Sequence, residues 1–370
     1  MRVTAICVLL GCLSWGCRAG SPGSSQTKPS GDEIAAEQAK HNGAKGRNVV
    51  RGVAWDANWR DRAHWYGTKN AERSLVRLKQ INANWIAVTP FSYQPRVDEP
   101  RIRFREGWSR GLDKDIRNAH RLGIKVLLKP HIWSNQFWDG SGNWRGTIKM
   151  SSEAEWAKWF DYYERWIVHV AKQAAAAKAD AFCVGLEYVK SSRAYAGRWR
   201  AIIRAVRRVF SGPLTYGAHT DELDLPFWDE LDAIGINAYF PIASSSRPTI
   251  GEMEQRWRAH GARLAALAKR YRKQVVFTEV GYASIDGAAR EPFRWPTAKD
   301  RRDLQEQANA YRALFNVAPS WPWFGGMFIW KYKIGGDGEH GSPSERHFVF
   351  QGKPAEHVIK SGFERKYARD

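Results

Sequence analysis

Eight short apolar or β-branched runs alternate with longer amphipathic stretches from residue 48 onward. The longer stretches show helical spacing, and the clearest of them, 112–122 and 152–178, have usable start and stop signals. Eight strands alternating with helices predict an α/β fold, a single (β/α)8 TIM barrel with loop insertions. A doubly wound open sheet is the main alternative, but no glycine-rich phosphate fingerprint follows any run. The predicted strands are 49–54, 85–89, 125–129, 182–186, 214–218, 233–237, 275–278 and 326–330.

The first 17 residues have the form of an export signal. One positive charge at Arg2 precedes a short apolar stretch, and small residues precede a cysteine. The segment 9–12 resembles a lipoprotein processing site but leaves a very short apolar stretch, whereas Cys17 lies at a more usual distance with Ser14 at a position that prefers an aliphatic residue. We expect an exported, membrane-anchored lipoprotein on the outer surface of a bacterium, lipidated at Cys17 or Cys12. An ordinary cleaved signal and a secreted protein is the alternative.

Residues 18–47 are rich in Ser, Gly, Lys, Gln and Ala without apolar periodicity, which is typical of a flexible linker. A single folded domain is therefore predicted to span 48–370, after a signal peptide at 1–17. Three of the four cysteines lie in the leader, so the domain keeps only Cys183 and forms no internal disulfide. Cys183 falls in an apolar run and is predicted to be a buried structural thiol.

The chain is strongly basic, with 58 Lys and Arg against 38 Asp and Glu and a formal net charge of +20. The basic residues are spread along helical faces such as 198–208, where a solvated face is the ordinary interpretation. An exported protein also rarely meets nucleic acid. We therefore expect no nucleic-acid partner, and anionic envelope glycans or lipid head groups match the charge better. A monomeric protein is a separate expectation.

Two of the predicted strands deliver a glutamate at their C-terminal ends. Glu187 follows the run 181–186, and Glu279 follows the run 274–278. In a barrel of parallel strands, the C-terminal ends face one pocket. Cleaving a glycosidic bond needs two carboxyl groups, one protonated to protonate the leaving oxygen and one ionised to attack or to activate water. The sequence therefore predicts a two-carboxylate site, and a pair of buried structural carboxylates is the alternative.

Several landmarks in fixed order resemble a clan of retaining glycosidases in which the acid/base glutamate ends strand four and the nucleophile ends strand seven. Within that clan the chain is most similar to glycoside hydrolase family 113, the β-mannanase group. The resemblance spans about residues 48–365. Each motif is weak alone, and their order and spacing make them specific. The landmarks lie at 51–53, 129–133, 185–187, 234–241, 277–282 and 328–330.

The resemblance implies that Glu187 is the general acid/base and Glu279 the nucleophile of a retaining hydrolysis of β-linked hexose polysaccharide or oligosaccharide, with β-1,4-mannan first among the substrates. One position departs from the pattern of the clan. Many clan members carry Asn before the acid/base, where it helps to hold the sugar 2-hydroxyl, and this chain has Leu186. Other β-glycans (glucan, chitosan-like or envelope polysaccharide) therefore stay open. So do a non-catalytic glycan-binding lipoprotein and a basic scaffold for nucleic acid or lipid head groups.

Further residues are predicted to contact the sugar. Tyr239 is expected either to hydrogen-bond the nucleophile or to be a core tyrosine bound to a backbone carbonyl. His131 has no Asp, Glu, Cys or second His at ligand spacing, so we expect no catalytic metal and no cofactor. The stretch 133–150 is predicted to form a long loop over the pocket. The predicted substrate-binding residues are Trp55, His131, Trp133, Asn237, Tyr239 and Trp330, with Trp138 and Trp144 as further aromatic platforms.

Overall fold

The computed structural model of this 370-residue chain describes residues 48–58, 61–104, 111–137, 139–335, 346–365 and 367. The chain divides into two units, Met1–Lys45 and Gly46–Asp370, and the fold below is that of the second. The predictions for the signal peptide, the linker and the lipidated cysteine lie outside the described residues, and so does the predicted platform Trp138.

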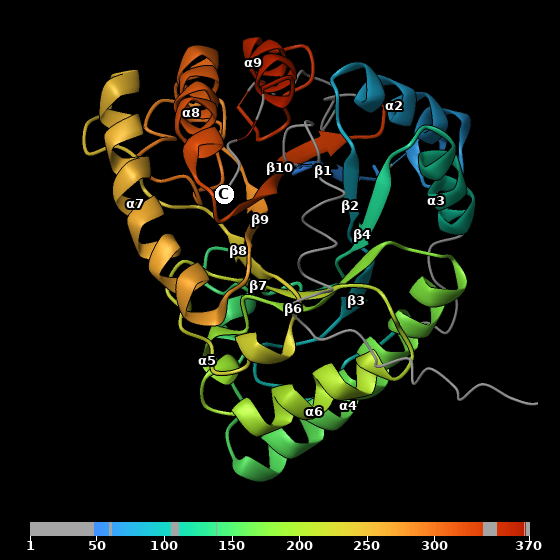
Figure 1. Ribbon diagram of the computed structural model, residues 1–370. Coiled ribbons are helices and arrows are strands. Elements are labelled where there is room, and N and C mark those ends of the chain that lie inside the picture. The colour runs from blue at the N-terminus through green and yellow to red at the C-terminus, as the bar shows by residue number, and fades with distance from the viewer. Residues whose placement is uncertain are drawn as a thin grey trace, which may run out of the picture. The chain divides into compact units, whose positions relative to one another are not determined.

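Eight parallel strands close into a barrel, as the sequence predicts. Figure 1 views this ring of strands with the helices around it. Around the ring the order is β1-β10-β9-β8-β7-β6-β4-β2, so strands that follow one another among these eight are neighbours. All the C-terminal ends therefore lie on one side of the barrel. The strands are β1 (Val50–Asp56), β2 (Trp85–Val88), β4 (Lys125–Leu128), β6 (Ala181–Leu186), β7 (Leu214–Ala218), β8 (Ile234–Asn237), β9 (Val275–Val280) and β10 (Phe324–Lys333).

The helices connect these strands and cover the outside of the barrel (Figure 1). Among the described residues they are α2 (Lys69–Gln80), α3 (Leu112–Arg121), α4 (Glu153–Ala176), α5 (Val189–Ser192), α6 (Ala196–Arg207), α7 (Ile250–Tyr271), α8 (Leu304–Val317) and α9 (Pro354–Phe363). Short 3-10 turns are η1 (Arg62–His64), η2 (Arg145–Thr147), η3 (Trp228–Glu230) and η4 (Ala318–Ser320). In the part of the chain that is described, no helix has the length and apolar character needed to cross a membrane.

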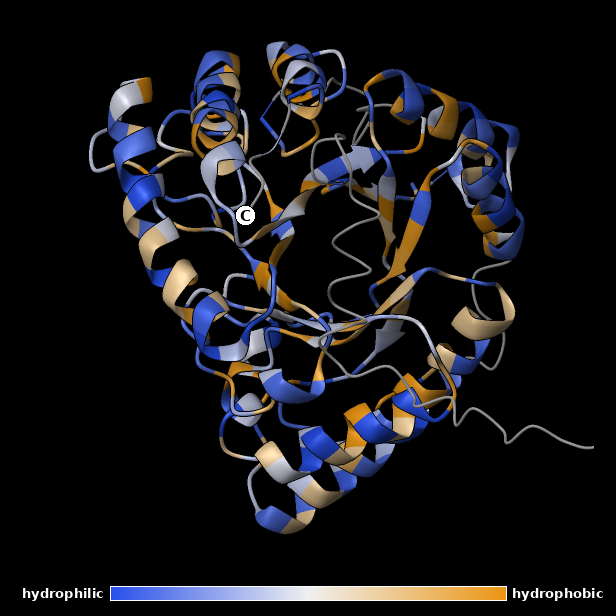
Figure 2. Ribbon diagram, in the orientation of Figure 1, coloured by the Kyte–Doolittle hydropathy of each residue, from blue (hydrophilic) through white to orange (hydrophobic). Residues whose placement is uncertain are grey.

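Helix α4 shows why the amphipathic pattern predicts a helix packed on the barrel. The Ser152 side chain accepts a hydrogen bond from the backbone N–H of Glu155 and so caps the first turn. Hydrophobic and hydrophilic residues alternate along the helix in Figure 2, and the hydrophobic ones recur at helical spacing. Truncating one large aromatic of this face to alanine is expected to cost about 3–5 kcal/mol. The buried face comprises Trp156, Trp159, Phe160, Tyr163, Trp166, Ile167, Val170, Ala171 and Ala174.

The barrel interior holds a small apolar cluster of Ala87, Leu127, Cys183 and Phe328. Gly52 makes room for it, because a Cβ on this glycine would lie 2.4 Å from the ring of Phe328. Cys183 is fully buried, as predicted, and burial raises the pKa of its thiol to about 11. A thiol that stays protonated at neutral pH is a packing residue rather than a nucleophile.

A second, two-stranded parallel sheet was not predicted from the sequence. It pairs β3 (Phe91–Tyr93) with β5 (His131–Trp133), which continue the chain just beyond barrel strands β2 and β4. Each strand has three residues, too few for an alternating pattern to be recognised. The sheet matters for the site because it carries His131 and Trp133. The segment 220–231 between β7 and β8 contains only the turn η3 among its regular elements.

Candidate active site

Glu187 directly follows β6 and lies in the left-handed region, with φ of 55°. A residue other than glycine adopts this conformation at a cost of about 1–2 kcal/mol, so its surroundings must hold it there. Its backbone N–H donates to the carbonyl of Gly217 at 2.9 Å, and the next N–H, of Tyr188, donates to Tyr216 Oη at 2.8 Å. The strained turn keeps Glu187, a residue that is only 8% exposed, at the C-terminal end of the barrel.

Arg145, from turn η2, provides the cation that faces Glu187. Its Nη1 donates to Glu187 Oε2 at 3.0 Å, and its Nη2 donates to His131 Nδ1 at 3.1 Å. Because a guanidinium only donates, Nδ1 accepts and the imidazole carries its hydrogen on Nε2. Burial, with Arg145 and two lysines nearby, holds the pKa of His131 well below its ordinary value. His131 is therefore a neutral group between charged ones.

Glu279 lies within β9, one residue before its end, and each of its carboxylate oxygens has a donor. Tyr239 Oη donates to Oε2 at 2.7 Å, and Lys129 Nζ donates to Oε1. Burial and the charge of Glu279 raise the pKa of Tyr239 well above its ordinary value, so the phenol keeps its hydrogen. Of the two predicted roles for Tyr239, the structure confirms the hydrogen bond to the second glutamate.

Two buried donors beside Glu279 have no hydrogen-bond partner within the described part of the chain. The first is His131 Nε2, which lies 3.9 Å from Glu279 Oε1. The second is Asn237 Nδ2, whose amide oxygen already accepts from Thr278 Oγ1 at 2.8 Å and from Lys129 Nζ at 3.4 Å. Buried polar groups are nearly always paired in folded proteins. Two exceptions beside one carboxylate are typical of a site that binds a polar ligand.

Aromatic rings continue from the carboxylates outward. Trp330, in β10, stacks on the His131 ring with an interplanar angle of 4° and a centroid distance of 6.3 Å. Phe91 and Trp133, on the small sheet, are 40% and 38% exposed and meet edge to face at 6.3 Å. Trp144 packs against His219 at 4.9 Å. The ring of His131 thus contacts Trp330 and Phe91, and Phe91 in turn contacts Trp133.

The predicted sugar contact of Trp55 is not supported by its position. Its side chain is 1% exposed, packs against Tyr66 at 5.2 Å and donates from Nε1 to Ser74 Oγ on α2 at 2.8 Å. It therefore belongs to the layer between β1 and the surrounding helices. The pairing of β1 with β10 shifts between Val53 and Trp55, an irregularity that the apolar pattern does not reveal.

Three buried ionisable side chains around the two glutamates were not predicted as site residues from the sequence. Lys129 was recognised only as part of the landmark 129–133, although its place at the end of the third barrel strand is a usable signal. Arg145 lies in the predicted loop 133–150, where no pattern indicates which side chain turns inward. Glu222, after β7, is fully buried and accepts from Ser192 Oγ at 2.7 Å and from the His219 N–H at 3.0 Å. Burial raises the pKa of Glu222 to about 8.

One acidic group could be considered for a metal ion. Ligand atoms of Asp286, Asp303 and Glu306 lie within 4.8 Å of one another. The carboxylates already serve the fold, since Asp303 caps α8 and Glu306 accepts from the N–H groups of Gly287 and Ala289. Arg301 also donates to Asp286 at 2.9 Å. These contacts account for the cluster without an ion.

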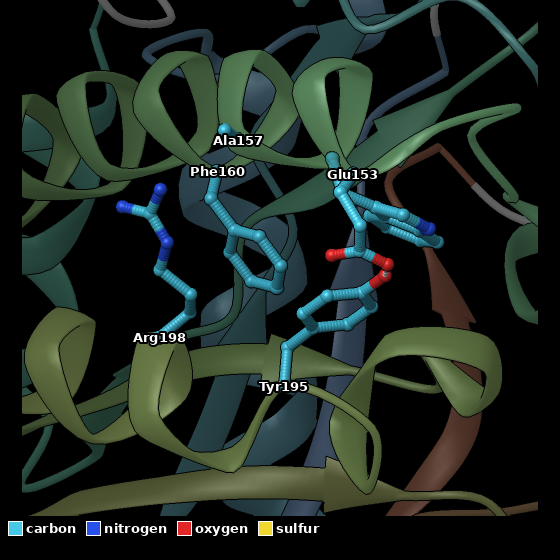
Figure 3. A pocket seen from close by; sticks show the side chains of 6 residues that line it. Glu153, Ala157, Phe160, Tyr195 and Arg198 are labelled. Carbon is cyan, nitrogen blue, oxygen red and sulfur yellow. Dashed lines mark hydrogen bonds between the residues drawn. The ribbon is translucent and has the colours of Figure 1, made fainter.

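A surface pocket of about 190 Å³ lies between α4 and α6 (Figure 3). Tyr195 points toward Glu153 and donates to its Oε1 at 2.8 Å, so this carboxylate is already engaged. Neither Glu187 nor Glu279 lines the pocket, which therefore belongs to the packing of the two helices. The lining residues are Glu153, Trp156, Ala157, Phe160, Tyr195 and Arg198.

Solved structures resemble the whole barrel. A β-1,4-mannanase of glycoside hydrolase family 113, solved as a complex, is 28% identical, with a TM-score of 0.74 over 86% of this chain and 100% of its own. The β-mannanase AaManA of Alicyclobacillus acidocaldarius, solved with ManMIm, is 27% identical, with a TM-score of 0.73 over 86% and 97% of the two chains.

More distant matches show the fold alone. A β-glucuronidase of Ruminococcus gnavus is 16% identical, with a TM-score of 0.57 over 86% of this chain and 50% of its own. None of the curated proteins compared with the chain matches it. The sequence profile of Glycoside Hydrolase Family 113 matches residues 53–353. The barrel and the buried pair Glu187 and Glu279 agree with this match, which confirms the resemblance found in the sequence. The chain belongs to glycoside hydrolase family 113.

Proposed function

We propose that this glycoside hydrolase acts with retention of anomeric configuration on a β-linked hexose polysaccharide or oligosaccharide, with β-1,4-mannan as the first candidate. The observation that supports the assignment of roles is the pair of donors on Glu279. A carboxylate that accepts from both a buried lysine and a buried tyrosine is favoured in its ionised form, which a nucleophile requires.

The proposed reaction has two steps. A Glu279 oxygen attacks the anomeric carbon while Glu187 gives its proton to the glycosidic oxygen, and the bond between that carbon and oxygen breaks. Glu187, now a carboxylate, takes a proton from water as the water oxygen attacks the anomeric carbon, and Glu279 leaves as a carboxylate. The unpartnered donors His131 Nε2 and Asn237 Nδ2 are placed to bind sugar hydroxyl groups in this scheme.

Another β-glycan is the second candidate, and Leu186 is the observation that favours it. This side chain is fully buried, so the position before the acid/base offers no polar group to a sugar 2-hydroxyl. Mannan, glucan and chitosan differ at that carbon. The two candidates share the mechanism and differ in the hydroxyl contacts that His131 and Asn237 would make.

The test of this function is hydrolysis of labelled β-oligosaccharides of the manno, gluco, xylo and glucosamine series, with the anomeric configuration of the first product followed by NMR. Cleavage of the manno series with retention supports the leading proposal, and preference for another series selects the second candidate. Inversion would overturn the mechanism. A folded protein that binds these sugars and cleaves none would be a glycan-binding lipoprotein instead.

We further propose that the enzyme is exported and held at a membrane by a lipid on Cys17 or, failing that, Cys12. The leader and the polar segment 18–47 support this proposal. Labelling with a fatty-acid analogue in a bacterial host tests it, with Cys17→Ala and Cys12→Ala identifying the site. Absence of label from the full-length protein would favour secretion after ordinary cleavage.

A further inference from the structure

Arg145 makes a buried ion pair with the proposed acid/base. The side chains of Arg145 and Glu187 are 6% and 11% exposed, and Nη1 lies 3.0 Å from Oε2. The guanidinium is held on its other side by His131 Nδ1 at 3.1 Å. An ion pair this far from solvent is screened little by water or salt.

The turn that carries Arg145 is fixed by its own contacts. Trp144 N–H donates to Thr147 Oγ1 at 3.2 Å, and Thr147 Oγ1 donates back to the Trp144 carbonyl at 2.8 Å. The Trp144 ring covers Gly146 so closely that a Cβ there would lie 2.4 Å from it. The same ring packs on His219. These contacts therefore fix the position of the turn, and with it the position of the Arg145 side chain.

The pair bears on the two roles proposed for Glu187, and this inference rests on that proposed function. Glu187 must be protonated in the first step and ionised in the second. A fixed cation favours the ionised form, so it lowers the pH at which the acid form is available and makes that acid a stronger donor. The protonation state of Glu187 before substrate binds therefore depends on Arg145.

Among the described charged or titratable groups around Glu187, Arg145 is the one that makes an ion pair with it. Lys129 makes an ion pair with Glu279, and Lys331 lies 3.3 Å from Asp56 and 5.3 Å from the centre of the Trp330 ring. His131 is neutral, and burial keeps the phenol of Tyr239 protonated. Below about pH 8, Glu222 is neutral as well. Tyr188, the next residue, is also kept protonated by burial, which raises its pKa.

We propose that Arg145 is a positioning residue that sets the pH range in which Glu187 passes between its acid and base forms, and so the pH range of hydrolysis. Replacing Arg145 with a neutral residue makes the ionised form of Glu187 less favourable relative to the protonated form. The limb of the kcat/KM profile that reports the acid form then moves to higher pH by about one to three units. A lysine at the same place retains the positive charge, so the profile of Arg145→Lys is expected to stay close to that of the wild type.

The first experiment follows the titration of Glu187 directly, without substrate. The carboxyl carbon of 13C-labelled glutamate is followed by NMR in the wild type, Arg145→Gln and Arg145→Lys, with the signal assigned by its loss in Glu187→Gln. The midpoint is expected to rise by about one to three pH units in Arg145→Gln and to stay near the wild-type value in Arg145→Lys. Equal midpoints in the wild type and Arg145→Gln would overturn the inference.

The second experiment compares pH profiles of kcat/KM for two leaving groups. An oligosaccharide needs the proton of Glu187, whereas a 2,4-dinitrophenyl glycoside does not. The shift in Arg145→Gln is expected only with the oligosaccharide, and Arg165→Gln on the surface of α4 is the control. A uniform loss at every pH would mean a merely structural role and contradict the inference. A moved NMR midpoint without any hydrolysis would support the control of the Glu187 titration by Arg145 and overturn the proposed function.

Discussion

Tyr239 Oη lies 2.7 Å from Glu279 Oε2, while Lys129 donates to the other oxygen of the same carboxylate. The tyrosine follows β8 and the lysine follows β4, so two separate parts of the barrel converge on one side chain. Hydrogen bonds to an ionised group are stronger than those between neutral groups. The arrangement favours a negative charge at Glu279 in a place where burial alone would oppose it.

Replacing Tyr239 with Phe is expected to lower kcat/KM by about 10- to 100-fold, because a hydrogen bond to a charged group contributes about 1.5–3 kcal/mol. Steady-state kinetics on an aryl β-glycoside measures the loss. The matched control is Tyr163→Phe, whose hydroxyl donates to the Val184 carbonyl at 2.8 Å away from the carboxylates. If both variants lost activity equally per folded molecule, the contact with Glu279 would have no special role.

Replacing Lys129 with Met is expected to lower the free energy of unfolding by about 3–5 kcal/mol, because it leaves the Glu279 carboxylate buried without its cation. Adding Glu279→Gln removes that charge and is expected to restore more than half of the loss. Urea unfolding of the four proteins of this cycle measures the coupling. The exposed pair Arg117–Asp113 provides a control, where Arg117→Met is expected to cost less than about 1 kcal/mol.

Glu222 is expected to make stability depend on pH. Its pKa is raised by burial from 4.5 to about 8 in the folded protein. Between about pH 5 and pH 8 the folded protein keeps a proton that the unfolded chain has lost, so the unfolding free energy falls as pH rises. Glu222→Gln retains hydrogen-bonding groups but cannot ionise. The difference between wild type and variant should change by up to about 4 kcal/mol across this range.

Denaturant midpoints of both proteins at pH 5 and pH 8 check this prediction. Every other titrating group contributes to both proteins, so the comparison isolates Glu222. Parallel pH profiles for the wild type and Glu222→Gln would show that the buried carboxyl is already ionised at pH 5.

Replacing Trp133 with Ala is expected to weaken the hydrolysis of long oligosaccharides more than that of short ones. The indole is 38% exposed and ends a series of ring contacts that runs from Trp330 through His131 and Phe91. Loss of one stacked ring should raise KM by about 10-fold for chains long enough to reach it. Comparing kcat/KM over oligosaccharides of two to six units tests this, and a loss independent of chain length would contradict it.

The barrel was predictable because its strands are short apolar runs with regular spacing. The predicted run 182–186 differs by one residue from β6, and 214–218 agrees with β7. The largest difference is at β10, which continues through Lys331 and Lys333. These lysines interrupt the apolar pattern, yet both are buried, and Lys331 faces Asp56 at 3.3 Å. A buried ion pair across two strands cannot be recognised from one strand's composition.

The two glutamates were predictable for the same reason, since both lie where a predicted strand ends. The cation at Glu187 was not, because Arg145 reaches it from a turn whose position depends on the packing of Trp144 on Gly146 and His219. For Trp55 the sequence predicts a sugar contact that the position of the side chain does not support. Its place beside a strand end suits a sugar platform, but the register shift in β1 and the hydrogen bond to Ser74 turn its indole into the core.

The roles of the two carboxylates are tested by azide rescue of Glu187→Ala and Glu279→Ala on an activated aryl β-glycoside, with the product configuration read by NMR. In Glu187→Ala the glycosyl-enzyme still forms, and azide attacks it from the side opposite Glu279 to give a β-glycosyl azide. In Glu279→Ala azide takes the place of the nucleophile and gives an α-glycosyl azide. We expect these two opposite products. The same configuration from both variants, or full activity in either without azide, would contradict the assignment of the two carboxylates.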